Sequence, residues 1–225
     1  MNVFNSYKQL STASVARVKA LVFVAALAPF LLLTLRGLNS WQGRSFNLGA
    51  NPIEFITRDL GDCTLIFLLI TLAVTPVRRI IGWQWLIKLR RMLGLFAFFY
   101  VSLHFVTYIW LDQFFDLHDI VKDVIKRPFI TVGFLAFVCL IPLAATSTNG
   151  MARRLGGKRW QALHRLVYAI AVLGVVHYWW LVKRDIREPL LYGAILAVLL
   201  GVRIYWKLQK RANALSPGTN LPQRV

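Results

Sequence analysis

The chain has 225 residues, 57% of them hydrophobic, and a mean hydropathy of +0.57. This composition is too apolar for an ordinary soluble domain and is typical of a protein that crosses a membrane several times. The formal net charge of +18 would suit a nucleic-acid ligand, an anionic membrane surface or a topology signal, and the positions of the charges decide among these.

Six apolar runs are long enough to cross a hydrocarbon core of about 30 Å, which takes about 20 helical residues. In chain order they cover residues 20–36, 61–77, 92–111, 128–148, 161–181 and 189–206. The sequence therefore predicts an all-α, polytopic membrane protein built as a bundle of six transmembrane helices. The predicted domain organisation is an N-terminal segment 1–19, a six-helix membrane domain 20–206 and a tail 207–225.

Lysine and arginine are unevenly distributed over the connections between these runs. The N-terminus, the second and fourth connections and the tail together hold 17 of the 27 basic residues. The positive-inside rule therefore predicts that both termini, and the segments 1–19 and 207–225, are cytoplasmic. All nine acidic residues fall on the opposite side. Topology accounts for the net charge, with attraction to anionic membrane lipid as a side effect, and no nucleic-acid partner is expected.

Three of the four histidines lie inside predicted spans, His104 in the third and His164 and His177 in the fifth. An ionisable side chain is costly in hydrocarbon, so a histidine at such a position is a candidate functional residue. Neutral imidazole is also an axial ligand of haem iron. The pattern predicts a buried redox cofactor. The alternative is a histidine that only donates a hydrogen bond to a neighbouring helix.

Depth in the membrane distinguishes the three histidines. His104 lies 8 residues before Asp112 and His177 lies 6 residues before Lys183, which places them roughly 12 Å and roughly 9 Å below the outer boundary. Because these depths agree within one helical turn, we expect one b-type haem between His104 and His177. His118, in the acidic connection 112–127, is expected to be a solvated loop residue.

His164 is predicted to be separate from this pair. It lies 13 residues before His177, which corresponds to roughly 20 Å along the helix and about 140° around it. The two side chains therefore cannot bind one iron. If His164 holds a cofactor, it is a second one on the inner side, and the position of a partner ligand falls near Arg90, where there is no histidine. Metal ligation and simple packing stay open for His164.

Basic side chains surround the inner end of the fifth span. They could hold a haem propionate, a flavin phosphate or a quinone carbonyl, or they could only mark topology and contact lipid headgroups. The candidates are Arg90, Arg91, Arg153, Arg154, Lys158 and Arg159.

Long motifs in the chain resemble one known family. SLHFVTYIW (102–110), KRPFITVGFLAF (126–137) and LAATSTNGMARRLGGKRWQALHRLVYAIAVLGVVHYWW (143–180) occur in the same order in the MsrQ family. These proteins are the haem-binding membrane subunits of the bacterial system that repairs methionine sulfoxide in periplasmic proteins. More distantly, the chain is similar to the transmembrane domain of ferric reductases and NADPH oxidases.

The resemblance implies a function and a set of partners. Electrons would come from the quinone pool or a flavin reductase and pass through haem b to a periplasmic, molybdopterin-containing methionine-sulfoxide reductase subunit. The protein would lie in the bacterial inner membrane as an electron-transfer subunit rather than the catalytic one. His104, His164 and His177 match the histidines that the family associates with haem, and FMN is a further cofactor implied by the family.

Two features differ from the oxidase relatives. The third span lacks an inner histidine, which leaves the second haem open, and no nucleotide-binding domain follows the sixth span. A self-contained transmembrane reductase of ferric iron or oxygen is one alternative, and the missing nucleotide-binding domain argues against it. A transporter or scaffold with structural histidines is another. The segments 37–60 and 112–127 are candidate docking surfaces for the partner, or bare connections.

Overall fold

The computed structural model describes residues 10–42, 48–182 and 185–215. Within these ranges the chain forms helices and no strand. Six helical segments are long and apolar enough to cross a membrane, which confirms the predicted all-α, six-span architecture of a multi-pass membrane protein. Lys183, from which the depth of His177 was measured, lies outside the described residues, as do residues 1–9 and 216–225 at the two ends.

Five of the six spans are longer than predicted, and the fourth, predicted to run to residue 148, ends at Ala145. They are α1 (Thr12–Trp41), α2 (Pro52–Ile81), α3 (Arg90–Thr107) continued by a π-helical turn (Tyr108–Asp112), α5 (Pro128–Ala145), α7 and α8 (Gly157–His164 and Leu166–Leu181), and α9 (Arg187–Leu215). Three short helices connect them, a 3-10 helix (Gln84–Lys88), α4 (Leu117–Lys126) and α6 (Asn149–Leu155).

The ends of α2 show why a helix can exceed its apolar run. The Asn51 side chain accepts a hydrogen bond from the amide of Glu54 at 3.2 Å, and Pro52 occupies the first turn, where its missing N–H costs nothing. At the other end Gly82 adopts φ 84° and donates its N–H to the Arg78 carbonyl. The capping interactions of Asn51 and Gly82, rather than the end of the apolar run, therefore set the length of this helix.

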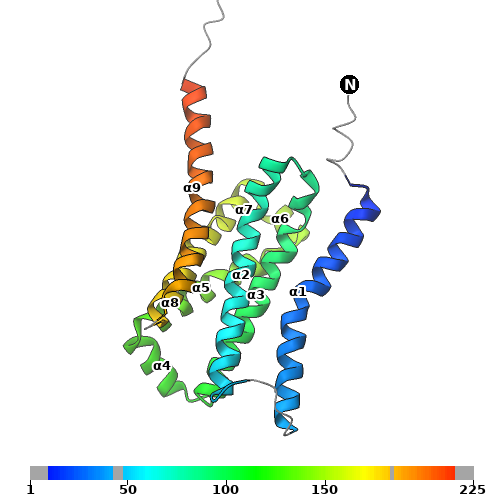
Figure 1. Ribbon diagram of the computed structural model, residues 1–225. Coiled ribbons are helices and arrows are strands. Elements are labelled where there is room, and N and C mark those ends of the chain that lie inside the picture. Colours follow the sequence, from blue (N-terminus) through cyan, green and yellow to red (C-terminus); the bar gives the residue numbers. More distant parts are fainter. Residues whose placement is uncertain (1–9, 43–47, 183–184, 216–225) are drawn as a thin grey trace, which may run out of the picture.

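The helices pack as two principal pairs (Figure 1). α2 makes its most extensive contact with α3, and α5 makes its most extensive contact with α8. A smaller contact between α3 and α5 joins the pairs, while α1 and α9 stand on the flanks. This arrangement brings the third and fifth spans, which carry the candidate histidines, to the centre of the bundle.

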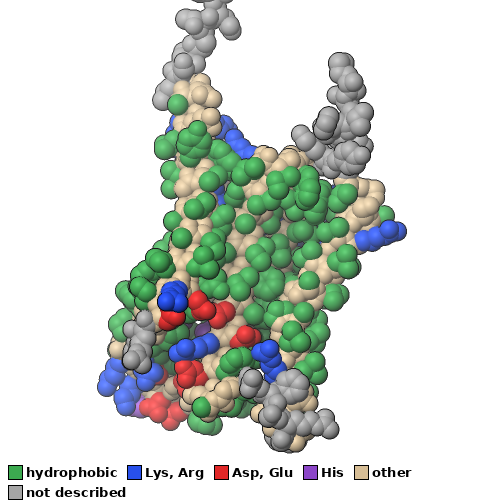
Figure 2. Space-filling model, viewed as in Figure 1, with side chains coloured by type: hydrophobic (Ala, Val, Ile, Leu, Met, Phe, Trp, Pro, Cys, Tyr) green, Lys and Arg blue, Asp and Glu red, His purple; other side chains and the backbone are tan. Residues whose placement is uncertain are grey.

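The two ends of the bundle differ in charge. We call one the basic end; it contains the start of α1, residues 82–89, α6, α7 and the end of α9. The other, the mixed-charge end, contains residues 48–51, the segment 112–127 with α4, and the start of α9. Figure 2 shows a broad band of hydrophobic side chains, with acidic and basic side chains gathered at the mixed-charge end below it. That band is the surface expected to face lipid.

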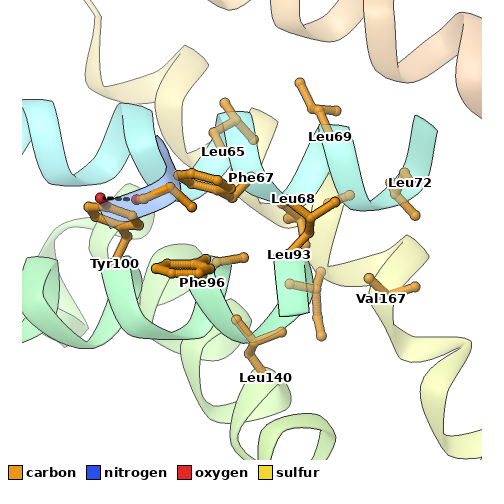
Figure 3. Packing of buried hydrophobic residues seen from close by; sticks show 14 of the residues in the cluster. Leu65, Phe67, Leu68, Leu69, Leu72, Leu93, Phe96, Tyr100, Leu140 and Val167 are labelled. Atoms are coloured by element: carbon orange, nitrogen blue, oxygen red, sulfur yellow. Dashed lines mark hydrogen bonds between the residues drawn. The ribbon is translucent and has the colours of Figure 1, made fainter. Parts of the chain in front are cut away.

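The core lies between α2 and α3 (Figure 3). The ring of Tyr100 is fully buried and stacks on that of Phe67, with ring centroids 5.3 Å apart. Its hydroxyl donates to the Ala26 carbonyl at 2.7 Å and accepts from the Phe30 amide at 3.2 Å. These two residues flank Pro29 in α1, so the tyrosine satisfies backbone groups where a proline disturbs the helix.

Two local predictions were wrong. The connection 112–127 is not a plain loop, because it contains α4, in which Asp116 accepts hydrogen bonds from the amides of His118 and Asp119. His118 is exposed, as expected, but lies in the first turn of this helix. The fifth span is not one continuous helix, because the chain forms a turn at Arg165, directly after His164.

Candidate functional site

His104 projects from α3 toward α2. Its Nδ1 lies 2.8 Å from the main-chain carbonyl oxygen of Thr57. A carbonyl oxygen only accepts hydrogen bonds, so Nδ1 carries the hydrogen and donates it. In the neutral imidazole this leaves the lone pair of Nε2 free. A metal-binding histidine is usually held in this way, with the second ring nitrogen fixed by a backbone carbonyl.

His177 repeats this arrangement in the other helix pair. It projects from α8 toward α5, and its Nδ1 donates to the main-chain carbonyl of Phe129 at 2.7 Å. Its Nε2 is therefore also the nitrogen with a free lone pair. Each pair of helices thus supplies one histidine and the carbonyl that orients it.

The two rings lie close together, edge to face, where the helix pairs meet. The His104 and His177 ring centroids are 6.3 Å apart, with an interplanar angle of 81°. The predicted proximity of these two histidines, based on their depth, is confirmed. With metal–nitrogen distances of about 2 Å, two imidazoles on opposite sides of one ion have centroids roughly 6 Å apart. The spacing and the free Nε2 atoms therefore fit a metal centre with two axial imidazoles.

A glycine of the facing helix lies against each ring. Gly61 of α2 adjoins the His104 ring, and Gly133 of α5 adjoins the His177 ring. Neither glycine stands out in the amino-acid sequence. The only available signal was a small residue at a depth similar to that of a histidine on another span, and depth does not say which helices face each other.

His164 is not part of this pair and already has partners. Its Nε2 lies 3.1 Å from Thr146 Oγ1, which itself donates to the Pro142 carbonyl at 2.6 Å. The single hydroxyl hydrogen is thereby used, so His164 Nε2 carries a hydrogen and donates it to Thr146. The Trp160 ring stacks on the imidazole with centroids 4.0 Å apart. Ligation through Nε2 would require His164 to give up the hydrogen bond to Thr146.

The predicted basic residues differ in how close they lie to His164. Arg90 and Arg91, at the start of α3, are close enough to His164 to act on it electrostatically. Arg91 also donates to the side-chain oxygen of Asn149 at 2.5 Å, which joins α3 to α6. Arg153 is exposed on α6. The structure thus brings Arg90 and Arg91 to the His164 region and leaves Arg153 at its surface.

Among the described residues, no group of three or more histidine, cysteine, aspartate or glutamate side chains lies close enough to hold an ion. The His104–His177 pair consequently suits a metal whose remaining ligands come from a cofactor ring rather than from the protein, as in haem.

Comparison with known proteins agrees with this geometry. Residues 60–175 match the family described as ferric reductase like transmembrane component. The match contains His104 and His164 and ends two residues before His177.

Curated relatives match nearly the whole chain. A protein of Herminiimonas arsenicoxydans is 62% identical over 203 residues, covering 88% of this chain and 90% of the relative. A protein of Ralstonia nicotianae is 51% identical over 217 residues, covering 96% of this chain and 97% of the relative. A third, from Xanthomonas euvesicatoria, is 50% identical and covers 94% and 97%. Each of the three is named protein-methionine-sulfoxide reductase heme-binding subunit MsrQ.

Proposed function

Since the chain belongs to the MsrQ family of heme-binding subunits, within the ferric reductase-like transmembrane proteins, we propose that it is a membrane electron-transfer subunit. It takes electrons from the quinone pool or a flavin reductase and passes them through haem b to a periplasmic, molybdopterin-containing methionine-sulfoxide reductase subunit. It thereby supports the repair of oxidised methionine in periplasmic proteins. The proposal places it in the bacterial inner membrane with both termini in the cytoplasm.

The observation that carries the proposal is the close pair His104 and His177. Both rings are held by backbone carbonyls on Nδ1, and their centroids are 6.3 Å apart. When bound, the haem supplies one-electron redox chemistry, which belongs to the cofactor. Two imidazoles would fill both axial positions, an arrangement that suits electron transfer better than oxygen activation.

The protein contributes the position and the tautomer of each ligand. The two helix pairs hold the histidines in fixed tautomers, so no proton needs to move for either Nε2 to act as a ligand. The pair lies in the half of the bundle nearer the mixed-charge end, because Thr57 and Phe129 are close to the starts of α2 and α5. A haem there would be near the surface that the proposal assigns to the periplasm.

The mixed-charge end supplies the surface for the partner subunit in this proposal. Within the candidate segment 112–127, α4 exposes an apolar row formed by Leu117, Val121 and Ile125 beside charged residues. Part of the other candidate segment, 37–60, lies outside the described residues.

A second cofactor is proposed at the basic end, near His164. Arg90 and Arg91, with Arg153 at the rim, would hold an anionic or carbonyl group such as a haem propionate, an FMN phosphate or a quinone oxygen. The half-buried position of Arg90 beside His164 supports this part of the proposal. The hydrogen bond from His164 to Thr146 would open if the imidazole became a ligand.

The test is a reduced-minus-oxidised absorption spectrum, with the haem-to-protein ratio, on the purified protein. We expect a low-spin, bis-imidazole spectrum that His104→Ala and His177→Ala each abolish. His118→Ala is the matched control, since this histidine is exposed on α4, and should leave the spectrum unchanged. A normal spectrum in His104→Ala protein would contradict the proposal.

Two further assays on the same purified protein distinguish the proposed function from the two alternatives. A self-contained reductase of ferric iron or oxygen would oxidise a nicotinamide cofactor without a second protein, and we expect no such activity. A transporter or scaffold with structural histidines would fold and support methionine-sulfoxide repair without any haem. We expect the haem-free variants to lose that support.

A further inference from the structure

We propose that Gly61 and Gly133 are positioning residues, which set the orientation of the His104 and His177 rings by leaving no side chain beneath them. This inference rests on the proposed haem between the two histidines. It concerns how the bundle aims the ligands rather than which residues ligate.

Gly133 leaves the least room. A Cβ at this position would lie 2.7 Å from Nδ1 and 2.8 Å from Cε1 of His177, and 3.1 Å from its Cγ. Contacts below 3.0 Å essentially never occur for real Cβ atoms, so the ring or the helix would have to shift. The ring is not a flexible chain end, because its Nδ1 is tied to the Phe129 carbonyl at 2.7 Å. An alanine at position 133 therefore competes directly with the hydrogen bond that orients His177.

Gly61 makes a similar but looser contact with the other ring. A Cβ there would lie 3.3 Å from both Cε1 and Nδ1 of His104. That separation is tight rather than forbidden, so a displacement of a few tenths of an ångström would relieve it. The expected effect of an alanine at position 61 is smaller than that at 133.

The two glycines occupy the same position relative to the carbonyl that orients each ring. Gly61 follows Thr57 by four residues in α2, and Gly133 follows Phe129 by four residues in α5. Residues four apart lie on one face of a helix. An imidazole that donates to the carbonyl of the first residue therefore lies over the second. Two separate helix pairs thus hold their histidines in the same way.

Close helix packing is the ordinary reason for a glycine in a membrane helix, and the other glycines allow a comparison. A Cβ at Gly94, Gly174 or Gly193 would lie 3.6–3.7 Å from an aliphatic carbon, which is ordinary van der Waals contact. Gly82 aside, which caps α2 with a positive φ, only Gly61 and Gly133 among the described glycines would press a Cβ closer than 3.4 Å onto another side chain. In both cases that side chain is a candidate ligand.

The experiment compares Gly133→Ala, Gly61→Ala and the control Gly174→Ala, which lies in the same helix as His177. The readouts are haem affinity, the electron paramagnetic resonance signature of the oxidised haem, and its midpoint potential. We expect Gly133→Ala to weaken haem binding by about 10–100-fold, as changes to residues that orient metal ligands do, and to alter the signature. Gly61→Ala should alter the signature with a smaller loss of affinity, and Gly174→Ala should match the parent.

A comparison in protein that lacks the His177 ring distinguishes the contact between position 133 and that ring from general misfolding. Thermal unfolding of the haem-free protein is measured for Gly133→Ala with His177 present and with His177→Ala. We expect the alanine to destabilise the first protein and not the second, because the ring it meets is gone. If Gly133→Ala alone does not accumulate as folded protein, recovery in the His177→Ala background supports the proposal, and failure to recover overturns it.

The outcomes also separate this inference from the proposed function. If His104→Ala and His177→Ala keep the parent spectrum, the proposed haem site itself is wrong. If those variants lose haem while Gly133→Ala binds it with parent affinity, signature and potential, only the positioning role is overturned. Equal destabilisation by Gly133→Ala in both backgrounds would overturn it as well.

Discussion

The guanidinium of Arg203 on α9 donates a hydrogen bond to the main-chain carbonyl of Leu72 on α2. Four residues after Leu72, α2 carries Pro76, which has no N–H to offer this carbonyl. Arg203 also donates to the Leu199 carbonyl at 2.6 Å, and its guanidinium carbon lies 5.6 Å from the centroid of the Tyr168 ring. A charged side chain thus replaces the hydrogen bond that a proline removes, and it joins the last helix to the core.

Because Arg203 replaces the hydrogen bond that Pro76 removes, the stability effect of changing Arg203 should depend on which residue occupies position 76. Arg203→Met keeps the aliphatic stem but leaves the fully buried Leu72 without its interhelical donor. We expect a loss of about 1 kcal/mol in the free energy of unfolding, within the range for hydrogen bonds between membrane helices. In the Pro76→Ala background the loss should be smaller, because the new N–H can donate to the Leu72 carbonyl. Unfolding by heat or denaturant in detergent measures both values.

The four proteins of this cycle contain their own control. The Pro76→Ala variant that keeps Arg203 measures how much the proline itself changes the free energy of unfolding. The double-mutant cycle subtracts this contribution from that of the double variant. An Arg203→Met cost that is the same in both backgrounds would show that the arginine acts through packing or charge rather than through the Leu72 carbonyl.

Tyr100→Phe should destabilise the contact between α1 and α3. The change removes a hydroxyl that donates to the Ala26 carbonyl and accepts from the Phe30 amide, and it leaves ring packing in place. We expect the free energy of unfolding to fall by about 1–2 kcal/mol, since buried backbone groups lose a partner. Tyr205→Phe, on an exposed part of α9, should have no measurable effect. Equal unfolding midpoints for the two variants would contradict the role assigned to the Tyr100 hydroxyl.

Counting residues along helices was sufficient to predict that His104 and His177 share a depth, which is the basis on which they were paired. His104 and His177 share a depth because the membrane aligns the helices and the rise per residue is constant. The orienting carbonyls of Thr57 and Phe129, and Gly61 and Gly133 beneath the rings, depend on which helix faces which. Neither hydropathy nor spacing contains that information, because every span has apolar residues on all sides.

One missed element could have been found from the sequence. Leu117, Ile120, Val121, Val124 and Ile125 recur at helical spacing after Asp116, a good N-cap residue. The many charges of the segment 112–127 favour a solvated connection and obscure this helical period. The break at Arg165 is different, because neither proline nor glycine marks that position.

The orientation proposed for the bundle predicts opposite labelling of its two ends. His118→Cys on α4 and Lys158→Cys on α7 place thiols at exposed positions of the mixed-charge and basic ends. A membrane-impermeant maleimide should label position 118 in intact spheroplasts and position 158 only after the membrane is permeabilised. The reason is the excess of basic residues that keeps the basic end in the cytoplasm.

The background for this labelling must lack the native thiols. Cys63 and Cys139 are free and half-buried within α2 and α5, so both are replaced by alanine and the parent is checked for zero labelling. Labelling at position 158 in intact spheroplasts, with none at 118, would reverse the orientation.

His164→Ala should separate the two proposed cofactor positions. Along the fifth span this histidine lies 13 residues before His177, a separation of roughly 20 Å. The His104–His177 haem should therefore keep its low-spin spectrum and midpoint potential in the variant, while the total of cofactor per protein falls. Thr146→Val is the matched control, because it removes the hydroxyl that accepts from His164 and donates to the Pro142 carbonyl but keeps the imidazole, and it should leave the total unchanged. Cofactor contents of purified His164→Ala and parent protein give the comparison. An unchanged total would mean that His164 only packs between Thr146 and Trp160. Loss of the His104–His177 spectrum would contradict the separation of the two sites.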